Sequence, residues 1–276
     1  LIYCAISGFG QDGHWVHRPA YDQIIQGASG VMSITGDPTS APLRVGYPIA
    51  DTIGGLTAAM TIGAALNADP RGTFIDVSML EATLATMGWV VSNYLIAGVV
   101  PAPRGNENPT SAPSGAFQCD GSLINIAANK DEQWHTLATH LDRTDLLNRP
   151  EFATRQKRTQ NRQALREELE KTLKTRPASA WEDELNRAGV PAGAILTVPE
   201  VLATPQVAER GMLATFPDVD GVGRDITVVR TGFKLDGDAP DVANPPPTLG
   251  AHNAEVFGAL EITDDELAEL KALGAV

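Results

Sequence analysis

Apolar and polar residues in the first third of the chain form blocks that predict strands and helices in turn. The β-prone run 1–7 is followed by helical spacing over 21–32 and by a longer helix over 52–67. A short apolar run at 74–77 then predicts a buried strand, and 79–97 predicts a largely buried helix. Because strands and helices alternate, we expect a parallel sheet that helices cover.

The pattern changes after Gly98. Residues 100–113 contain four prolines, which is typical of a linker or a functional loop rather than of a helix or strand. Beyond them, the runs 114–118 and 122–127 flank Cys119-Asp120-Gly121 and predict a hairpin. We then expect helices at 131–141, 161–174 and 178–188, short strands at 192–197, 214–216 and 226–229, and two short C-terminal helices. This order indicates an α+β module distinct from the first.

The composition of the 276 residues excludes several classes of protein. With 43% apolar and 20% charged residues, the chain can bury a sizeable core. Its net charge of −13 argues against non-specific binding of nucleic acid. No run approaches eighteen uninterrupted apolar residues, so we expect no membrane-spanning helix and no membrane partner. Two cysteines, Cys4 and Cys119, cannot form a disulfide framework, and we expect a cytoplasmic protein.

Common cofactor and metal motifs are absent from the sequence. There is no phosphate-binding Gly-Lys-Ser/Thr loop, and Gly8 and Gly10 lack the third glycine of a dinucleotide-binding fingerprint. The five histidines show no ligand spacing with cysteines or carboxylates, so we expect no metal site. Cys4 lies in an apolar strand, where a core position is favoured over a nucleophile.

Two features admit both a structural and a functional interpretation. Asp51 stands immediately before the predicted helix 52–67, where an aspartate is a natural N-cap, and the pattern alone favours that role. A carboxylate near a helix N-terminus can also remain ionised and take part in chemistry. The segment Gly105 to Asn108 is either a mobile lid, since glycine permits unusual backbone angles, or an ordinary interdomain turn.

Short motifs spread along the whole chain form a specific combination. They are LIYCAISGFGQ at 1–11, HRPAYD at 17–22, SITG at 33–36, IADTIGG at 49–55, GVPAG at 189–193 and PPTLGAH at 246–252. In these motifs the chain resembles the family III CoA-transferases, the group of formyl-CoA transferase and carnitine CoA-transferase. The resemblance implies an enzyme that uses coenzyme A and acyl-CoA as substrates and holds no permanent cofactor.

The resemblance implies that Asp51 is the catalytic nucleophile. Members of the family attack an acyl-CoA thioester with this carboxylate and pass through a mixed anhydride and an aspartyl-CoA thioester. Aspartate needs no general base for this attack, because it is ionised at pH 7. The same fold also hosts 2-methylacyl-CoA racemases, in which a histidine stands where Tyr21 lies, thirty residues before the aspartate. Because tyrosine is a poor proton shuttle at pH 7, Tyr21 favours transfer over racemisation.

Further residues are implied to bind the substrates. Tyr21, Asp22 and Gln26 are expected to line the CoA or acyl channel, and the alternative is a helix face packed under the first loop. Arg18 is expected to reach a phosphate or carboxylate, and the alternative is an exposed arginine without such a role. Arg104, Gly105 and Asn106 are expected to bind the substrates, with Arg104 and Asn106 near the distal carboxylate. The loop lacks the consecutive glycines of formyl-CoA transferase, and it resembles members that act on short dicarboxylates. We expect succinyl-CoA as donor and a C4–C5 dicarboxylate as acceptor.

The resemblance also implies a domain organisation. It predicts a Rossmann-like, doubly wound large domain over 1–98, a linker and glycine loop over 99–112, a small α+β domain over 113–232, and a return to the large domain over 233–276. The family forms an interlocked homodimer and carries on the order of a hundred further residues upstream, the opening half of the doubly wound domain. Because the chain starts at Leu1 without an initiator methionine, we expect that upstream part to be missing. A non-catalytic fragment or partner subunit is therefore a third possibility.

Overall fold

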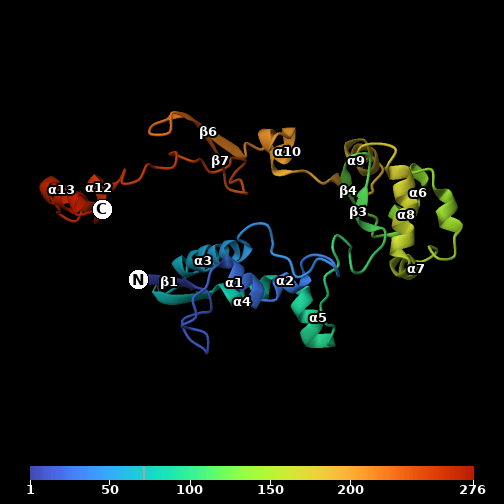
Figure 1. Ribbon diagram of the computed structural model, residues 1–276, viewed down its shortest axis with the longest axis horizontal. Helices are drawn as coiled ribbons and strands as arrows, with labels where there is room; N and C mark the ends of the chain where they lie inside the picture. Colours follow the sequence, from blue (N-terminus) through green and yellow to red (C-terminus); the bar gives the residue numbers. More distant parts are fainter. Residues whose placement is uncertain (71) are drawn as a thin grey trace. The chain divides into compact units, whose positions relative to one another are not determined.

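The computed structural model describes residues 1–70 and 72–276. Contacts between residues divide the chain into two units, Leu1–Ile195 and Leu196–Val276. In Figure 1 the first unit runs from blue to yellow and the second from orange to red. This division lies inside the small domain predicted for 113–232, and the predicted domain boundaries stay a prediction.

The first unit contains most of the secondary structure. Its elements are β1 (Ile2–Ser7), α1 (Asp22–Ala28), α2 (Val31–Ile34), α3 (Ile49–Leu66), β2 (Thr73–Ser78), α4 (Met79–Thr86), α5 (Trp89–Ala97), β3 (Ser114–Gln118), β4 (Leu123–Ala127), α6 (Asp131–His140), a 3-10 helix (Thr144–Asn148), α7 (Arg155–Gln160), α8 (Arg162–Leu173), α9 (Ala178–Arg187) and β5 (Ala192–Ala194). Those of the second unit are α10 (Val198–Leu202), α11 (Pro205–Glu209), β6 (Leu213–Val219), β7 (Arg224–Val229), α12 (Asn253–Gly258) and α13 (Asp264–Ala272).

The N-terminal region, residues 1–98, is built on the parallel pair β1 and β2. Ile2 lies opposite Thr73 and Ser7 opposite Ser78, and α3 packs against both strands and against α4. The crossover between the strands runs through α1, α2 and α3, as a parallel pair requires. The predicted parallel, helix-covered sheet is confirmed for these two strands, and the doubly wound arrangement stays a prediction.

Two helices predicted to be continuous are broken at glycines. The helix predicted for 21–32 ends at Ala28 and restarts as α2, because Gly30 has a φ of 84°. The helix predicted for 79–97 is divided into α4 and α5 by Gly88, whose φ is 49°. Glycine adopts such left-handed backbone angles without the clash that a Cβ atom would cause, so each glycine turns the chain.

The length and hydropathy of helix α3 do not agree with the expectation that no helix could span a membrane. It has 18 residues with a mean hydropathy of 1.4, so by length and composition alone it could cross a membrane, and 17% of it is buried. One such helix is weak grounds for a membrane span. Its contacts with β1, β2 and α4 are those of a helix that covers a sheet.

The core region, residues 112–194, surrounds the antiparallel sheet β3-β4-β5. The predicted hairpin is confirmed: Ser114 pairs with Ala127 and Gln118 with Leu123, and the turn between them contains Gly121 with a φ of 62°. Helices α6, α8 and α9 supply large apolar side chains that pack with the strands into one buried cluster. Its most deeply buried large members include Trp134, Phe152, Ile124, Ile126, Leu137, Leu141, Leu146, Leu165, Leu169 and Leu173.

The second unit contains the antiparallel pair β6 and β7, with an irregularity between Phe216 and Val219. A capping box begins α13, since the Thr263 hydroxyl accepts from the Glu266 amide and the Glu266 carboxylate accepts from the Thr263 amide.

Candidate active site

Asp51 lies in the first turn of α3, and its side chain is exposed. The helix begins at Ile49, so Asp51 is its third residue, and the expectation that it caps a helix starting at 52 is wrong. Pro48 occupies the N-cap instead and makes no side-chain cap bond. Among the described residues, the Asp51 carboxylate takes part in no hydrogen bond or ion pair. It is therefore available for reaction, at the positive end of the helix dipole.

Two buried polar residues of α1 hold the segment that leads into the first turn of α3. Asp22 Oδ1 accepts a hydrogen bond from the Ala50 amide at 2.9 Å, and its Oδ2 accepts one from Gln26 Nε2 at 2.7 Å. Gln26 in turn accepts from the Val45 amide at 2.9 Å and donates to the Tyr47 carbonyl. A distant aspartate thus satisfies an amide that the Pro48 N-cap leaves open. The geometry supports a positioning role for Asp22 and Gln26, and their predicted contact with CoA stays a prediction.

Arg18 and Tyr21 are both exposed, unlike their buried neighbours in α1. Tyr21 is the N-cap residue of α1, and its side chain is 81% accessible to solvent. The Arg18 guanidinium lies 4.5 Å from the ring centroid of Trp15, and this cation–π interaction positions the guanidinium. Both side chains can therefore reach a ligand from solvent.

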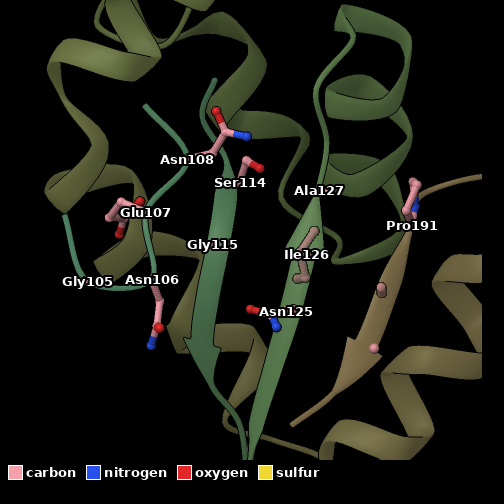
Figure 2. Close-up of a pocket in the computed structure, with 12 residues that line it drawn as sticks. Gly105, Asn106, Glu107, Asn108, Ser114, Gly115, Asn125, Ile126, Ala127 and Pro191 are labelled. Atoms are coloured by element: carbon pink, nitrogen blue, oxygen red, sulfur yellow. The ribbon is translucent and has the colours of Figure 1, made fainter. Parts of the chain in front are cut away.

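The loop Gly105 to Asn108 borders a cavity of about 610 Å³ in the core region. Strands β3, β4 and β5 form its other walls, and Figure 2 shows the loop running beside β3. The carboxamides of Asn106 and Asn125 are polar groups in its lining, whereas Asp51 is not among the residues that line it. Arg104 and Asn106 are the residues predicted near a distal carboxylate, and of these two Asn106 lines this cavity.

Asn125 was not singled out by the sequence, although a signal for it was present. Within β4, Ile124 and Ile126 are buried at 0 and 2% exposure, while Asn125 between them is exposed. Because side chains alternate between the two faces of a strand, a polar residue between two buried isoleucines must face away from the core. The Ile-Asn-Ile run therefore indicates a polar position on the outer face of the sheet.

The loop is tied to both regions that it connects. The Gly105 amide donates to the Gly36 carbonyl at 2.6 Å, which links the loop to the N-terminal region. The Asn108 amide donates to the Ser114 carbonyl at 3.1 Å, at the start of β3. A Cβ atom on Gly115 would lie 2.7 Å from the Asn106 carbonyl oxygen, so only glycine at 115 allows the loop to lie this close to the strand.

The Gly36 carbonyl that accepts from Gly105 begins a turn over residues 36–40, and this turn is ordered by its own hydrogen bonds. Asp37 accepts from the hydroxyl and the amide of Thr39 and from the Ser40 amide. These bonds, first of all the one from the Thr39 hydroxyl, lower the pKa of Asp37 to about 2. The carboxylate therefore remains charged and the turn formed at any pH near neutrality.

Arg104 lies at a different cavity from Asn106. A second cavity of about 590 Å³ is bordered by α5 and by residues 99–102, 104–105 and 107–110, and Arg104 and Trp89 line it. Gly105 borders both cavities. The structure therefore divides the residues predicted near a distal carboxylate between two cavities.

The described residues show no gathered set of metal ligands, and the thiol of Cys119 is held protonated. Within residues 1–70 and 72–276, no three histidine, cysteine or carboxylate side chains gather where they could hold a metal ion. Cys119 is buried, and burial together with the nearby charge of Glu170 raises the pKa of its thiol to about 11. A thiol that stays protonated is a poor nucleophile.

Comparison with known proteins finds one matching family model and several curated relatives. The sequence model of CoA-transferase family III matches residues 1–253. A curated relative, "Acetyl-CoA:oxalate CoA-transferase" of Acetobacter aceti, is 39% identical over 77% of this chain and 56% of its own length. "Succinate--glutarate CoA-transferase" of Agrobacterium fabrum is 35% identical over 95% of this chain and 66% of its own. The human "Succinyl-CoA:glutarate CoA-transferase" is 30% identical over 100% of this chain and 64% of its own.

A solved structure shows the same fold. A CAIB/BAIF family protein from Brucella suis, 33% identical in sequence, superposes with a TM-score of 0.82 over 94% of this chain and 68% of that one. The chain thus spans between 56 and 66% of the length of the three curated relatives. The mixed α/β fold is that of the CAIB/BAIF structures.

Proposed function

Because the chain belongs to CoA-transferase family III, we propose that the full-length protein moves CoA from an acyl-CoA to a free carboxylic acid. The observation that carries this proposal is the family match over residues 1–253, which includes the exposed Asp51 in the first turn of α3. Three curated relatives that cover most of the chain are named CoA-transferases, which supports the same reaction here.

We assign the nucleophile of this reaction to Asp51. Its carboxylate oxygen attacks the thioester carbonyl, a C–O bond forms, the C–S bond breaks, and CoA leaves as a thiolate. The thiolate then attacks the aspartyl carbonyl of the mixed anhydride and expels the donor acid, which leaves an aspartyl-CoA thioester. The acceptor carboxylate attacks this thioester, and the released thiolate takes the acceptor acyl group from the second anhydride. Asp51 is regenerated, and no proton or electron is gained or lost.

Water must be kept from both intermediates, because it would hydrolyse the anhydride and the thioester. The Gly105–Asn108 loop is the element we assign to this task, and what supports it is its place at the border of a cavity. Arg18 and Tyr21 are exposed on the α1 side and are the residues we assign to contacts with CoA. Asp22 and Gln26 are assigned to hold the segment before Asp51.

For the substrates we propose succinyl-CoA as donor and a C4–C5 dicarboxylate as acceptor. The names of the Agrobacterium and human relatives pair succinate or succinyl-CoA with glutarate, which supports this choice. The Acetobacter relative is named for oxalate, a shorter dicarboxylate. Asn106 and Asn125 offer amide donors and acceptors to the acyl group in one cavity, and Arg104 offers a positive charge in the other.

We further propose an interlocked homodimer in the cytoplasm. The proposal follows the family resemblance, and exposed apolar side chains of the N-terminal region support it. Phe74 on β2 is 58% exposed, and Trp89 and Ile96 on α5 are 62 and 86% exposed. Both cysteines are free, which agrees with a reducing compartment.

The test is a transfer assay with the full-length protein. Succinyl-CoA is incubated with glutarate, mesaconate, oxalate and acetate in turn, and each new CoA ester is identified by mass spectrometry. We expect a C4–C5 dicarboxylate to give the highest kcat/KM. Transfer to oxalate alone would refute the substrate proposal while keeping the reaction. Exchange of the α-proton of a 2-methylacyl-CoA in deuterated water, without transfer to any acid, would instead establish a racemase.

A further inference from the structure

Arginines on α7 and α8 contact the segment that follows the loop. Arg155 Nε donates to the Thr110 carbonyl at 3.1 Å, and Arg158 Nε donates to the Ala112 carbonyl at 3.0 Å. Arg162 and Arg166 lie one and two turns farther along, in α8. The spacing of three, four and four residues places all of them on one face of the two consecutive helices.

The last two arginines of this face bind the loop itself. Arg162 Nη1 donates to Glu107 Oε2 at 2.8 Å. Arg166 donates to the other carboxylate oxygen of Glu107 and to the Ala116 carbonyl of β3. Each of the three charged side chains is only 21 to 23% exposed, so water screens these pairs less than it screens surface pairs. Charge-assisted bonds of this kind are roughly twice as strong as bonds between neutral groups.

The partners of Glu107 are themselves held by the core region. The Arg166 guanidinium stacks 5.1 Å from the ring centroid of the buried Phe117. Helix α8 carries Leu165 and Leu169 into the buried cluster at 0 to 1% exposure. Because rigid neighbours already order the Arg166 side chain, pairing with Glu107 costs little further conformational entropy.

Asn106 is the single residue between Gly105 and Glu107, which are both held by hydrogen bonds. Gly105 is bonded to the N-terminal region at Gly36, and Glu107 is bonded to α8. Among the described residues, no hydrogen bond involves the side chain of Asn106, which lies between them and lines the cavity. In Figure 2 the Glu107 side chain extends from the loop on the side away from β4, while Asn125 projects from β4. The bonded residues on either side thus hold the backbone of Asn106 at the border of the cavity.

We propose that Glu107 is a positioning residue, which through Arg162 and Arg166 holds the loop at the cavity and so places Asn106 against the acyl group. This inference rests on the proposed function for its effect on transfer, but the hold on the loop does not depend on any activity. A carboxylate is needed at 107 because two guanidinium groups converge on it. Glutamine keeps one acceptor oxygen but turns an amide donor toward the second arginine.

The first test follows the loop without any substrate. The bond between Arg104 and Gly105 lies at the start of the loop, Arg104 is exposed, and trypsin cleaves after arginine. In the full-length protein we expect Glu107→Ala to speed cleavage at this bond about tenfold or more, and Glu107→Gln to speed it less, because cleavage tracks local opening. Glu167→Gln is the matched control, since Glu167 is exposed on α8 and, among the described residues, its carboxylate accepts a hydrogen bond only from Gln163.

The second test follows transfer in the same variants. We expect Glu107→Ala to lower kcat about 10- to 100-fold while KM for succinyl-CoA changes less than about threefold, because misplacement of a positioning group affects the reacting geometry more than CoA binding. Release of free CoA in the absence of an acceptor should rise as water enters. A purely structural role would lower the amount of folded protein without changing this ratio of hydrolysis to transfer.

The outcomes separate this inference from the proposed function. Unchanged cleavage at Arg104 in Glu107→Ala would overturn the hold on the loop, and faster cleavage with unchanged kcat would overturn the positioning role. If Glu107→Ala does not fold, Glu107→Gln decides both questions in its place. If the wild-type protein transfers no CoA to any acid, the proposed function fails and with it the role toward the acyl group, while the trypsin comparison still decides whether Glu107 holds the loop.

Discussion

In the core region Trp134, Phe152 and Leu169 are 0 to 2% exposed, whereas in the N-terminal region Leu56, Met60 and Trp89 are 62 to 69% exposed. The core region buries its large apolar side chains in one continuous cluster. The buried apolar residues of the N-terminal region are fewer and mostly small or β-branched, namely Ile25, Val31, Ala50, Ala58, Val77 and Ala82.

The core region thus supplies stability, whereas the N-terminal region carries the proposed nucleophile, Asp51. In the core region, burial of apolar area supplies the free energy, and the arginine face of α7 and α8 uses that rigid support to hold the loop. In the N-terminal region, the Ala50 amide in the first turn of α3 donates to Asp22, and Gln26 accepts from the Val45 amide in the segment before the helix. Substitutions in the two regions should therefore change different properties, and four predictions test this.

The largest effect is expected at Asp51. Asp51→Asn removes the nucleophilic oxygen but keeps the size of the side chain, so transfer should fall by a factor of at least about 10³. Because no described hydrogen bond uses the carboxylate, thermal unfolding should change little. Glu81→Gln is the matched control, since Glu81 is exposed in the first turn of α4. Transfer at a near-normal rate in Asp51→Asn would remove the assignment.

The next effect concerns the core region by itself. Residues 112–194 produced alone should unfold cooperatively in urea, because the whole buried cluster lies within them. Within this segment Leu169→Ala should lower the free energy of unfolding by about 2–5 kcal/mol, and Glu167→Ala on the exposed face of α8 by no more than about 0.5 kcal/mol. The absence of a cooperative transition in the segment would show that its core depends on the N-terminal region.

A smaller effect is expected at the polar network of the N-terminal region. Asp22→Ala leaves the buried Ala50 amide without an acceptor and removes one of the two acceptors of the Gln26 amide, which should cost about 1–3 kcal/mol of unfolding free energy. It should also lower kcat, because the first turn of α3 loses its support. Asp22→Asn keeps an acceptor oxygen for Ala50 and should cost less. Equal stability and kcat in Asp22→Ala and wild type would argue against the positioning role.

The smallest effect depends on pH. Glu168 on α8 is bonded to Lys171, Arg143 and Arg149, and these cations, Lys171 first, lower its pKa to about 2 from an ordinary 4.5. A depressed pKa stabilises the fold above pH 4.5, and this contribution is lost as the pH falls from 4.5 toward 2. Because the pairs are partly exposed, we expect about 1 kcal/mol or less. Urea midpoints measured between pH 5 and 2 should fall less steeply in Glu168→Gln than in wild type, while Glu132→Gln on α6 should follow wild type.

Local patterns predicted most of the elements correctly. The runs on either side of Cys119-Asp120-Gly121 predicted the hairpin β3-β4, and the apolar runs at 1–7 and 74–77 predicted the parallel pair β1 and β2. These signals are local, since they depend on side chains a few residues apart. The start of α3 was misplaced because the acceptor for its Ala50 amide comes from Asp22, 28 residues away, and no local pattern reveals it.

The contacts of the loop could be predicted only in part. The resemblance drew attention to Gly105 and Asn106, but Glu107 pairs with Arg162 and Arg166 at sequence separations of 55 and 59 residues. The regular arginine spacing on α7 and α8 was present in the sequence as a signal of a basic helix face, and only the fold shows that this face meets the loop. Which cavity Arg104 and Asn106 each line depends on the path of the loop, which a loop sequence does not determine.

Whether Asp51 forms the covalent intermediates is the central claim, and chemical trapping tests it most directly. The full-length protein is incubated with succinyl-CoA and then with hydroxylamine, which attacks the carbonyl of an aspartyl anhydride or thioester and leaves a hydroxamate. Peptide mass spectrometry should find the hydroxamate on Asp51, only when succinyl-CoA was present, and not on Glu81. Efficient CoA transfer with Asp51 unmodified, or with the hydroxamate on another carboxylate, would contradict the account.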